Sequence, residues 1–210
     1  MEDYLVPTKA SEAEFVEKRS RFLGQVFPVE CEEQAREQLE AIRKQHYNAT
    51  HNCWCYRLQE GGTERYSDDG EPQGTAGQPM LNVFQREQVT NVLCVVTRYF
   101  GGILLGAGGL VRAYSQGAKL ALDAAGISVM RLWTCLDIPC PYHLLERIKL
   151  AAAGRGGVIS DVEYGVDVLL HTMFPAQETE PFIRELTDLS NGKVQGIVTG
   201  QTRRAFPVEP

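Results

Sequence analysis

Residues 98–114 read RYFGGILLGAGGLVRAY, a glycine-rich segment with an arginine before it and another shortly after it. The pattern predicts a strand, a loop and the start of a helix, where backbone amides of Gly108 and Gly109 approach an anion closely. Arg98 and Arg112 would then clamp a phosphate or a carboxylate from two sides. Tight packing of strand against helix, with both arginines in structural ion pairs, is the alternative. The loop lacks the Gly-Lys-Ser/Thr of a phosphate-binding P-loop.

A second polar segment, residues 67–79, reads SDDGEPQGTAGQP and places three carboxylates within four positions. Asp68, Asp69 and Glu71 supply oxygen ligands of the kind that divalent cations prefer. Their spacing does not follow the calcium-loop pattern, and turn hydrogen bonds from aspartate with a left-handed glycine explain the same residues. We therefore expect a structured surface loop, including Thr75, that shapes a groove without a bound metal.

The stretch HNCWCYR at residues 51–57 brings histidine and cysteine together, which raises the question of a zinc site or a thiol nucleophile. On a strand, Cys53 and Cys55 point to the same face. No second pair of cysteines stands at ligand spacing, so we expect both thiols in a core. His51 is either a general base or a satisfied polar residue at the start of a strand.

Positive charge also gathers in the stretch EKRSRF at residues 17–22. Arg19 and Arg21, together with Lys18, are able to contact phosphates. The alternative is a solvated strand edge, because charged side chains commonly protect an edge from pairing with another chain.

The elements that must position these residues follow from periodicity and from turn signals. We expect a first domain over residues 1–129, with strands at 4–6, 14–18, 21–29, 52–58 and 89–99 and helices at 32–46 and 110–125. We expect a second domain over residues 130–210, with strands at 134–139, 158–164, 166–174 and from 194, and helices at 142–153 and 181–189. The order β-α-β-β-α-β in the second domain is the ferredoxin-like pattern. The predicted fold class is therefore α+β.

Composition limits the functional classes. Of the 210 residues, 43% are hydrophobic and 23% charged, which is normal for a globular protein. A net charge of −6 argues against a generic nucleic-acid binder, though a local basic patch remains compatible with it. No apolar run approaches ~18 residues, so no membrane span is expected. The acidic start MEDY lacks the core of a signal peptide, which predicts a cytoplasmic protein with reduced thiols.

Four stretches together resemble the IMPACT family, also called the YigZ family: residues 19–24, 51–57, 67–79 and 95–114. Cys55 departs from the family pattern, in which alanine is usual. The resemblance implies a first domain similar to domain two of a small-subunit ribosomal protein and to domain four of elongation factor G. It implies a ferredoxin-like second domain similar to domain five of that factor. Those relatives act on RNA or the ribosome, and eukaryotic members of the family regulate translational control.

The leading interpretation is a translation-associated binding protein that contacts RNA or a ribosome-linked protein. Its expected anion-binding residues are cations and glycines that converge on one open spot: Arg19, Arg21, Arg98, Gly108, Gly109 and Arg112. One alternative is an enzyme for a small anionic substrate, in which the acidic loop holds a metal and His51 is the acid or base. The other is a protein-interaction module with an exposed apolar patch. No catalytic residue and no cofactor is assigned, and the oligomeric state stays open.

Overall fold

The computed structural model describes residues 3–207, which form two compact units. The first unit holds residues 4–130 and 205–207, and the second holds residue 3 and residues 131–204. The sequence placed the domain boundary between residues 129 and 130. Met1 and Glu2 of the acidic start, and the last three residues of the expected second domain, lie outside the described residues.

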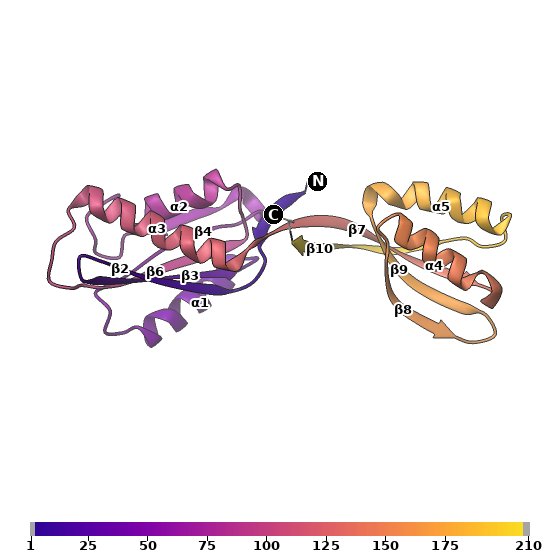
Figure 1. Ribbon diagram of the computed structural model, residues 1–210, viewed down its shortest axis with the longest axis horizontal. Helices are drawn as coiled ribbons and strands as arrows, with labels where there is room; N and C mark the ends of the chain where they lie inside the picture. The colour runs from indigo at the N-terminus through magenta and orange to yellow at the C-terminus, as the bar shows by residue number, and fades with distance from the viewer. Residues whose placement is uncertain (1–2, 208–210) are drawn as a thin grey trace. The chain divides into compact units, whose positions relative to one another are not determined.

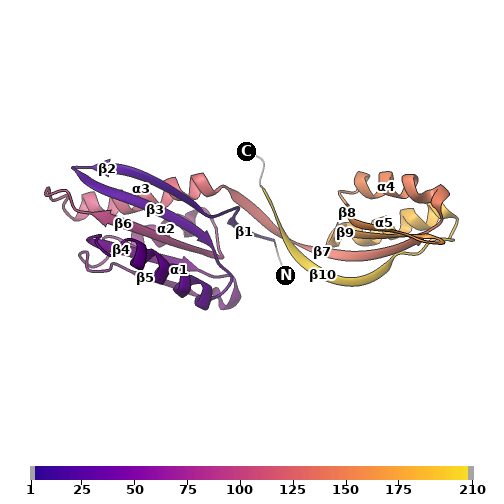
Figure 2. The ribbon, with the colours of Figure 1, turned by 90° about the horizontal axis from the view of Figure 1, so that it is seen from below.

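The first unit is built on a five-stranded antiparallel sheet (Figure 2). Its strands run in the order β2 (Ser11–Glu17), β3 (Ser20–Pro28), β6 (Val92–Tyr99), β4 (His51–Arg57) and β5 (Glu64–Ser67). The register sets Phe22 opposite Arg98 and Cys55 opposite Cys94. Three segments with candidate functional residues therefore lie on neighbouring strands: residues 17–22 at β3, Arg98 on β6 and residues 51–57 on β4.

Helices cover both faces of this sheet (Figure 1). Helix α1 (Glu32–Gln45) packs on one face, while α2 (Gly77–Arg86) and α3 (Ala107–Ala125) pack on the other. Because side chains alternate along a strand, the sheet separates two hydrophobic cores. Phe22 and Tyr114 belong to the core under α2 and α3. Leu39 and Tyr56 belong to the core under α1.

Two glycines bring α3 close to the sheet. A side chain on Gly24 of β3 would overlap the backbone carbonyl of Gly117 in α3. Only glycine permits this approach, which holds the middle of α3 close against the sheet.

The second unit has the ferredoxin-like element order. After β7 (Ile127–Cys140) come η2 (Tyr142–Leu144), α4 (Leu145–Gly154), β8 (Val158–Tyr164), β9 (Val168–Pro175), α5 (Ala176–Ser190) and β10 (Ile197–Pro207). The strand order is β10-β7-β9-β8, and β1 (Tyr4–Pro7) pairs with the first residues of β7. Apolar residues of α4 and α5 share one core with β7 and β9. The predicted α+β fold with two domains is confirmed.

The structure adds elements that the sequence patterns did not predict. Helix α2, strand β5 and the short η1 (Glu60–Gly62) occupy a region expected to be loop or left unassigned. Pro79 stands in the first turn of α2, where no backbone N–H is needed. Helix α5 begins five residues before the expected start and contains Pro181. Across residues 3–207, no helix has the length and apolar character needed to span a bilayer.

Candidate binding sites at the start of helix α3

Arg98, at the end of β6, is buried and paired rather than open to a ligand. Its side chain is 5% exposed, and NH1 donates to Glu71 Oε1 at 2.6 Å. NH2 donates to Ser20 Oγ at 3.3 Å. The guanidinium lies over the rings of Phe22 and Phe100, at 5.5 and 5.4 Å from their centres. The charge of Arg98 is thus neutralised inside the protein, which corrects the expectation that it clamps an external anion.

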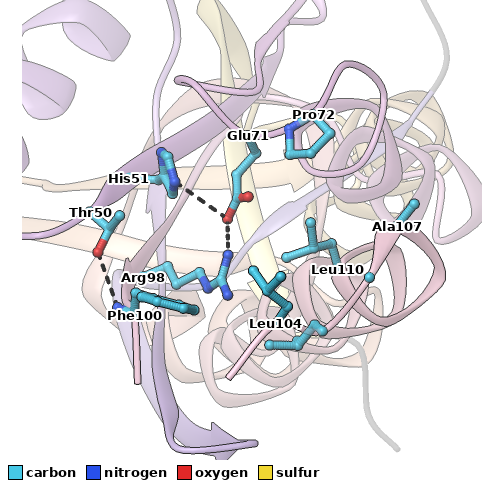
Figure 3. A pocket seen from close by; sticks show the side chains of 11 residues that line it. Thr50, His51, Glu71, Pro72, Arg98, Phe100, Leu104, Ala107 and Leu110 are labelled. Carbon is cyan, nitrogen blue, oxygen red and sulfur yellow. Dashed lines mark hydrogen bonds and ion pairs between the residues drawn. The ribbon is translucent and has the colours of Figure 1, made fainter. Parts of the chain in front are cut away.

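Glu71 is the acid at the centre of this buried network (Figure 3). Its Oε1 also accepts a hydrogen bond of 2.7 Å from the Tyr114 hydroxyl, and His51 Nε2 lies 3.9 Å away. Burial, followed by the neighbouring Cys53 thiol and the Glu71 carboxylate, raises the pKa of Tyr114. The phenol therefore stays protonated and remains a donor to Glu71.

His51 opens β4, and its position fixes the tautomer of a neutral ring. Nδ1 lies 2.8 Å from the backbone carbonyl of Asp69. A carbonyl oxygen only accepts hydrogen bonds, so Nδ1 carries the proton and Nε2 keeps a free lone pair in the neutral form. The acceptor nitrogen is the one on the side of Glu71.

The other carboxylates of the acidic loop are used for structure. Asp68 accepts backbone N–H groups of Gly74, Ala76 and Gly77 at 2.8, 3.0 and 2.8 Å. Two of those amides stand where α2 begins, so Asp68 caps that helix from a distance in sequence. Asp69 Oδ2 accepts the backbone N–H of Asn52 at 2.7 Å.

This geometry does not assemble a cation site from the acidic loop. Asp68, Asp69 and Glu71 bond to three different sets of partners. Thr75 is buried, and its hydroxyl donates to the carbonyl of Pro72 at 2.6 Å. Among residues 3–207, no group of three or more histidine, cysteine, aspartate or glutamate side chains is placed to hold a metal.

A pocket of about 360 Å³ lies above the buried pair, between the acidic loop and the glycine-rich loop (Figure 3). Thr50, His51, Glu71 and Arg98 line its polar side. Its apolar side and its edge at the start of α3 are lined by Pro72, Phe100, Leu104, Leu105, Gly106, Ala107 and Leu110. Leu104 is 82% exposed, although it is a large apolar residue. The two segments that the sequence singled out therefore border one cavity.

A separate basic surface lies at the turn between β2 and β3. Glu17 pairs with Ser20, so Lys18 and Arg19 form a two-residue hairpin turn. Their φ angles of 45° and 65° are both left-handed. A side chain on Gly101 would overlap the backbone carbonyl of Arg19, so this turn lies directly against the glycine-rich loop.

Arg112 lies in the second helical turn of α3, on the side of the helix next to the β2–β3 hairpin turn. Lys18 and Arg112 line one cavity of about 150 Å³, together with Glu17, Gly109 and Leu105. Gly108 lies beside the guanidinium, since a Cβ built on it would be 3.9 Å from Arg112 NH1. We call Lys18, Arg19 and Arg112 the basic end.

Arg21 is not part of the basic end. It pairs with Glu14 at 3.6 Å, and its guanidinium lies 4.6 Å from the centre of the Tyr99 ring. Arg21 and its neighbour Phe22 point to opposite faces of the sheet, and Phe22 lies under α3. The four arginines expected at one spot therefore occupy three places, and only Arg19 and Arg112 lie in the basic end.

Comparisons with known proteins cover both units. The Impact N-terminal domain family matches residues 18–122, and the domain of unknown function DUF1949 matches residues 138–193. IMPACT family member YvyE of Bacillus subtilis (strain 168) is 37% identical over 194 residues, which are 92% of this chain and 89% of the relative. The chain belongs to the IMPACT family. Family member YigZ of Escherichia coli (strain K12) is 36% identical over 200 residues, 93% of this chain and 97% of the relative. A crystal structure of a hypothetical protein has a TM-score of 0.61 at 34% identity, covering 95% of this chain and 98% of that one.

Cys53 and Cys55 of this IMPACT family member are core residues, as the strand pattern predicted. Cys53 and Cys55 are buried on the face under α2, and all six thiols of the chain are free. Burial raises the pKa of both thiols, so they stay protonated. Cys53 donates to the backbone carbonyl of Asp68, which ties β4 to the capping residue of α2.

Sequence reasoning missed several polar residues of this family member. Ser20 and Tyr114 hold the buried network, but each sits in a pattern typical of a strand or a helix. His171 in the second unit lies 2.7 Å from Asp137 and 3.2 Å from Glu163. The sequence indicates which residues of a predicted strand share a face. It does not indicate which strands are neighbours, so the partners of these side chains could not be predicted.

Proposed function

We propose that this IMPACT family member is a translation-associated binding protein that contacts RNA through the basic end. One observation supports this most directly: among residues 3–207, Lys18, Arg19 and Arg112 have no ion pair, while Arg21 and Arg98 do. Cations without an acidic partner remain free to neutralise phosphates. The translation-associated role itself rests on family membership and on the role in translational control that the resemblance implies.

The hairpin turn gives a second reason. A two-residue hairpin with both φ angles positive is a type I′ turn, which strongly favours Asn-Gly. This chain has Lys18-Arg19 there instead. Left-handed backbone costs a residue with a Cβ about 1–2 kcal/mol. A costly conformation that presents two long cations points to selection for binding rather than for stability.

The start of α3 adds positive potential beside these side chains. The first turn of a helix has unsatisfied backbone N–H groups and a partial positive charge. Helix α3 is 19 residues long, and Gly109 of its first turn lines the same cavity as Lys18 and Arg112. A phosphate in this cavity would meet guanidinium, ammonium and amide donors together, with Glu17 as the one opposing acid.

A test replaces the turn and the helix residue separately. The double variant Lys18→Asn/Arg19→Gly removes two cations and installs the residues that the turn prefers. We expect its stability to be unchanged or raised by up to about 1 kcal/mol, while its affinity for a fluorescein-labelled RNA hairpin falls. In anisotropy titrations over a range of salt concentrations, the log–log slope should decrease by roughly 0.7–0.9 for each cation removed, as it should in Arg112→Gln.

Lys44→Gln is the matched control, because Lys44 is an exposed cation of the same unit in α1, on the opposite face of the sheet. Its binding curve and salt slope should match those of the parent protein. Equal losses of RNA affinity in Lys44→Gln and Arg112→Gln would show that binding depends on the net charge of the protein and not on the basic end. Unchanged RNA affinity in both basic-end variants would remove the proposal.

A further inference from the structure

The large pocket over the Arg98–Glu71 pair contains hydrogen-bond donors without an acceptor. Arg98 lines the pocket at 5% exposure, and no acceptor for its Nε is found within the described part of the chain. Gly106 and Ala107 line the same pocket where α3 begins, and the first backbone N–H groups of a helix have no acceptor within that helix. Buried donors are nearly always hydrogen-bonded, so this wall indicates a ligand that brings an acceptor.

His51 supplies an acceptor to the same pocket. In the neutral ring, Nδ1–H donates to the carbonyl of Asp69 and Nε2 keeps its lone pair (Figure 3). Arg98 and Glu71 lie 2.6 Å apart and neutralise each other, so the polar wall has donors and an acceptor but no net side-chain charge. A charged ligand would lose hydration there without gaining a counterion. The wall therefore favours an uncharged group that carries both donors and acceptors.

The other walls of the pocket are apolar and partly aromatic. Leu105 and Leu110 are buried beside it, while Phe100 is 45% and Leu104 82% exposed. The backbone N–H of Phe100 donates to Thr50 Oγ1 at 3.0 Å, which holds this residue beside the pocket. A volume of about 360 Å³ falls within the range of ~300–1,000 Å³ typical of small-molecule sites. The pocket therefore suits a flat, uncharged ring with polar atoms along its edge.

Leu105 connects this pocket to the basic end, because it lines both the pocket and the smaller cavity of about 150 Å³. Unstacked bases of single-stranded RNA lie against aromatic rings and use their edges for hydrogen bonds, while the phosphates meet cations. We infer that the pocket binds one unstacked nucleobase of an RNA strand whose phosphates lie at the basic end. The base lies against Phe100 and Leu104, with its polar edge toward His51 and the start of α3. This identification of the ligand rests on the proposed RNA binding.

Nucleosides test the pocket without any phosphate. Adenosine, guanosine, cytidine and uridine are titrated separately into the full chain, and the backbone amide resonances of His51, Gly106 and Ala107 are followed by NMR. We expect at least one nucleoside to shift these resonances in a saturable manner, while ribose alone leaves them in place. No shift with any of the four, or equal shifts with ribose, would overturn the inference.

Oligonucleotides test whether a base of a bound strand reaches the pocket. Fluorescein-labelled octamers of adenylate, cytidylate and uridylate are compared by anisotropy with an abasic ribose-phosphate octamer of the same charge. At least one base-bearing octamer should bind about fivefold or more tightly than the abasic one, which corresponds to about 1 kcal/mol of stacking at one base. Phe100→Leu and Leu104→Ser should each lower this affinity ratio, to about twofold in Phe100→Leu, and leave the salt slope unchanged. An unchanged ratio in both variants would contradict the base pocket.

Tyr66→Leu is the matched control, because Tyr66 is an aromatic residue of the same unit with a similar exposure of 47% and lies outside the pocket. It should leave the affinity ratio unchanged. Lys18→Asn/Arg19→Gly should weaken the base-bearing and abasic octamers alike. If it does so while the ratio in the parent chain is onefold, the base pocket is rejected and RNA binding stands. If nucleosides shift the pocket resonances but this double variant changes no octamer affinity, the pocket stands and RNA binding at the basic end is rejected.

Discussion

Arg98 and Glu71 are side chains of opposite charge that are both more than nine-tenths buried, at 5% and 4% exposure. Removing two charges from water costs several kcal/mol each, and only close pairing with further hydrogen bonds offsets that cost. Ser20 and Tyr114 supply those bonds. A single substitution in this network should therefore lower the free energy of unfolding more than a substitution in an exposed ion pair does.

The first prediction concerns this pair. Glu71→Met should lower the free energy of unfolding by about 3–5 kcal/mol, because it leaves the Arg98 charge buried without a counterion. The double variant Glu71→Met/Arg98→Met should be more stable than that single variant, since it removes both charges. Urea unfolding monitored by circular dichroism measures both.

The exposed pair Arg36–Glu32 serves as the comparison, with side chains 75% and 38% exposed. Glu32→Ala should change stability by no more than about 0.5 kcal/mol. If the double variant were less stable than Glu71→Met alone, the destabilisation by Glu71→Met would not come from the unpaired charge of Arg98.

At the scale of elements, helix α2 depends on a residue outside itself. Its N-cap, Ala76, has no side chain able to cap, and Asp68 supplies the carboxylate from eight residues earlier. Gly77 and Pro79 were interpreted as loop residues because both interrupt regular structure. Proline in a first turn loses no hydrogen bond, so this signal was compatible with a helix start. A cap that folds back from a loop cannot be found by the local spacing of a capping box.

The second prediction concerns that cap. Asp68→Ala should lower the free energy of unfolding by about 2–3 kcal/mol, because three backbone amides lose a charged acceptor at once. Amide hydrogen exchange should also accelerate at residues 76 and 77 more than in α3. As a control, Asp123→Asn removes a carboxylate that makes a surface ion pair with Lys119 and should cost no more than about 1 kcal/mol. Equal denaturation midpoints for Asp68→Ala and the parent chain would show that the cap is dispensable.

At the scale of the whole molecule, the order of helices and strands was easier to predict from the sequence than the contacts between side chains. The ferredoxin-like unit was predictable because strands and helices of ordinary length alternate with clear turn signals. The candidate site was only partly predictable. Residue types and spacing marked the acidic loop and the glycine-rich loop as candidate functional segments, and the fold brings both to one pocket. Local spacing could not reveal that Glu71 neutralises Arg98, because that contact joins residues 27 apart, one in the loop before α2 and the other near the end of β6.

Charge in the second unit is also organised across strands. His171 of β9 bonds to Asp137 of β7 and to Glu163 of β8, and the register sets Asp161 opposite it as well. Arg204 of β10 reaches Met173, two residues further along the same face. Acids therefore dominate the immediate surroundings of the ring. The hydrogen bond to Asp137 is the largest cause of the raised pKa of His171, burial opposes it, and Glu163 adds to it.

The last prediction is a pH dependence confined to the second unit. A group whose folded pKa is raised contributes stability that is fully present below its unfolded pKa, about 6.5 for histidine, and lost as pH rises through the folded value. The destabilisation caused by His171→Asn should therefore be larger at about pH 6 than at about pH 9. The chain has two tryptophans, so in a Trp54→Phe background the fluorescence of Trp133 reports unfolding of the second unit alone. His143→Asn, an exposed histidine of the same unit, should show no such difference. A destabilisation by His171→Asn that is equal at both pH values, or greater at the higher one, would mean that the three-strand cluster does not stabilise the charged ring.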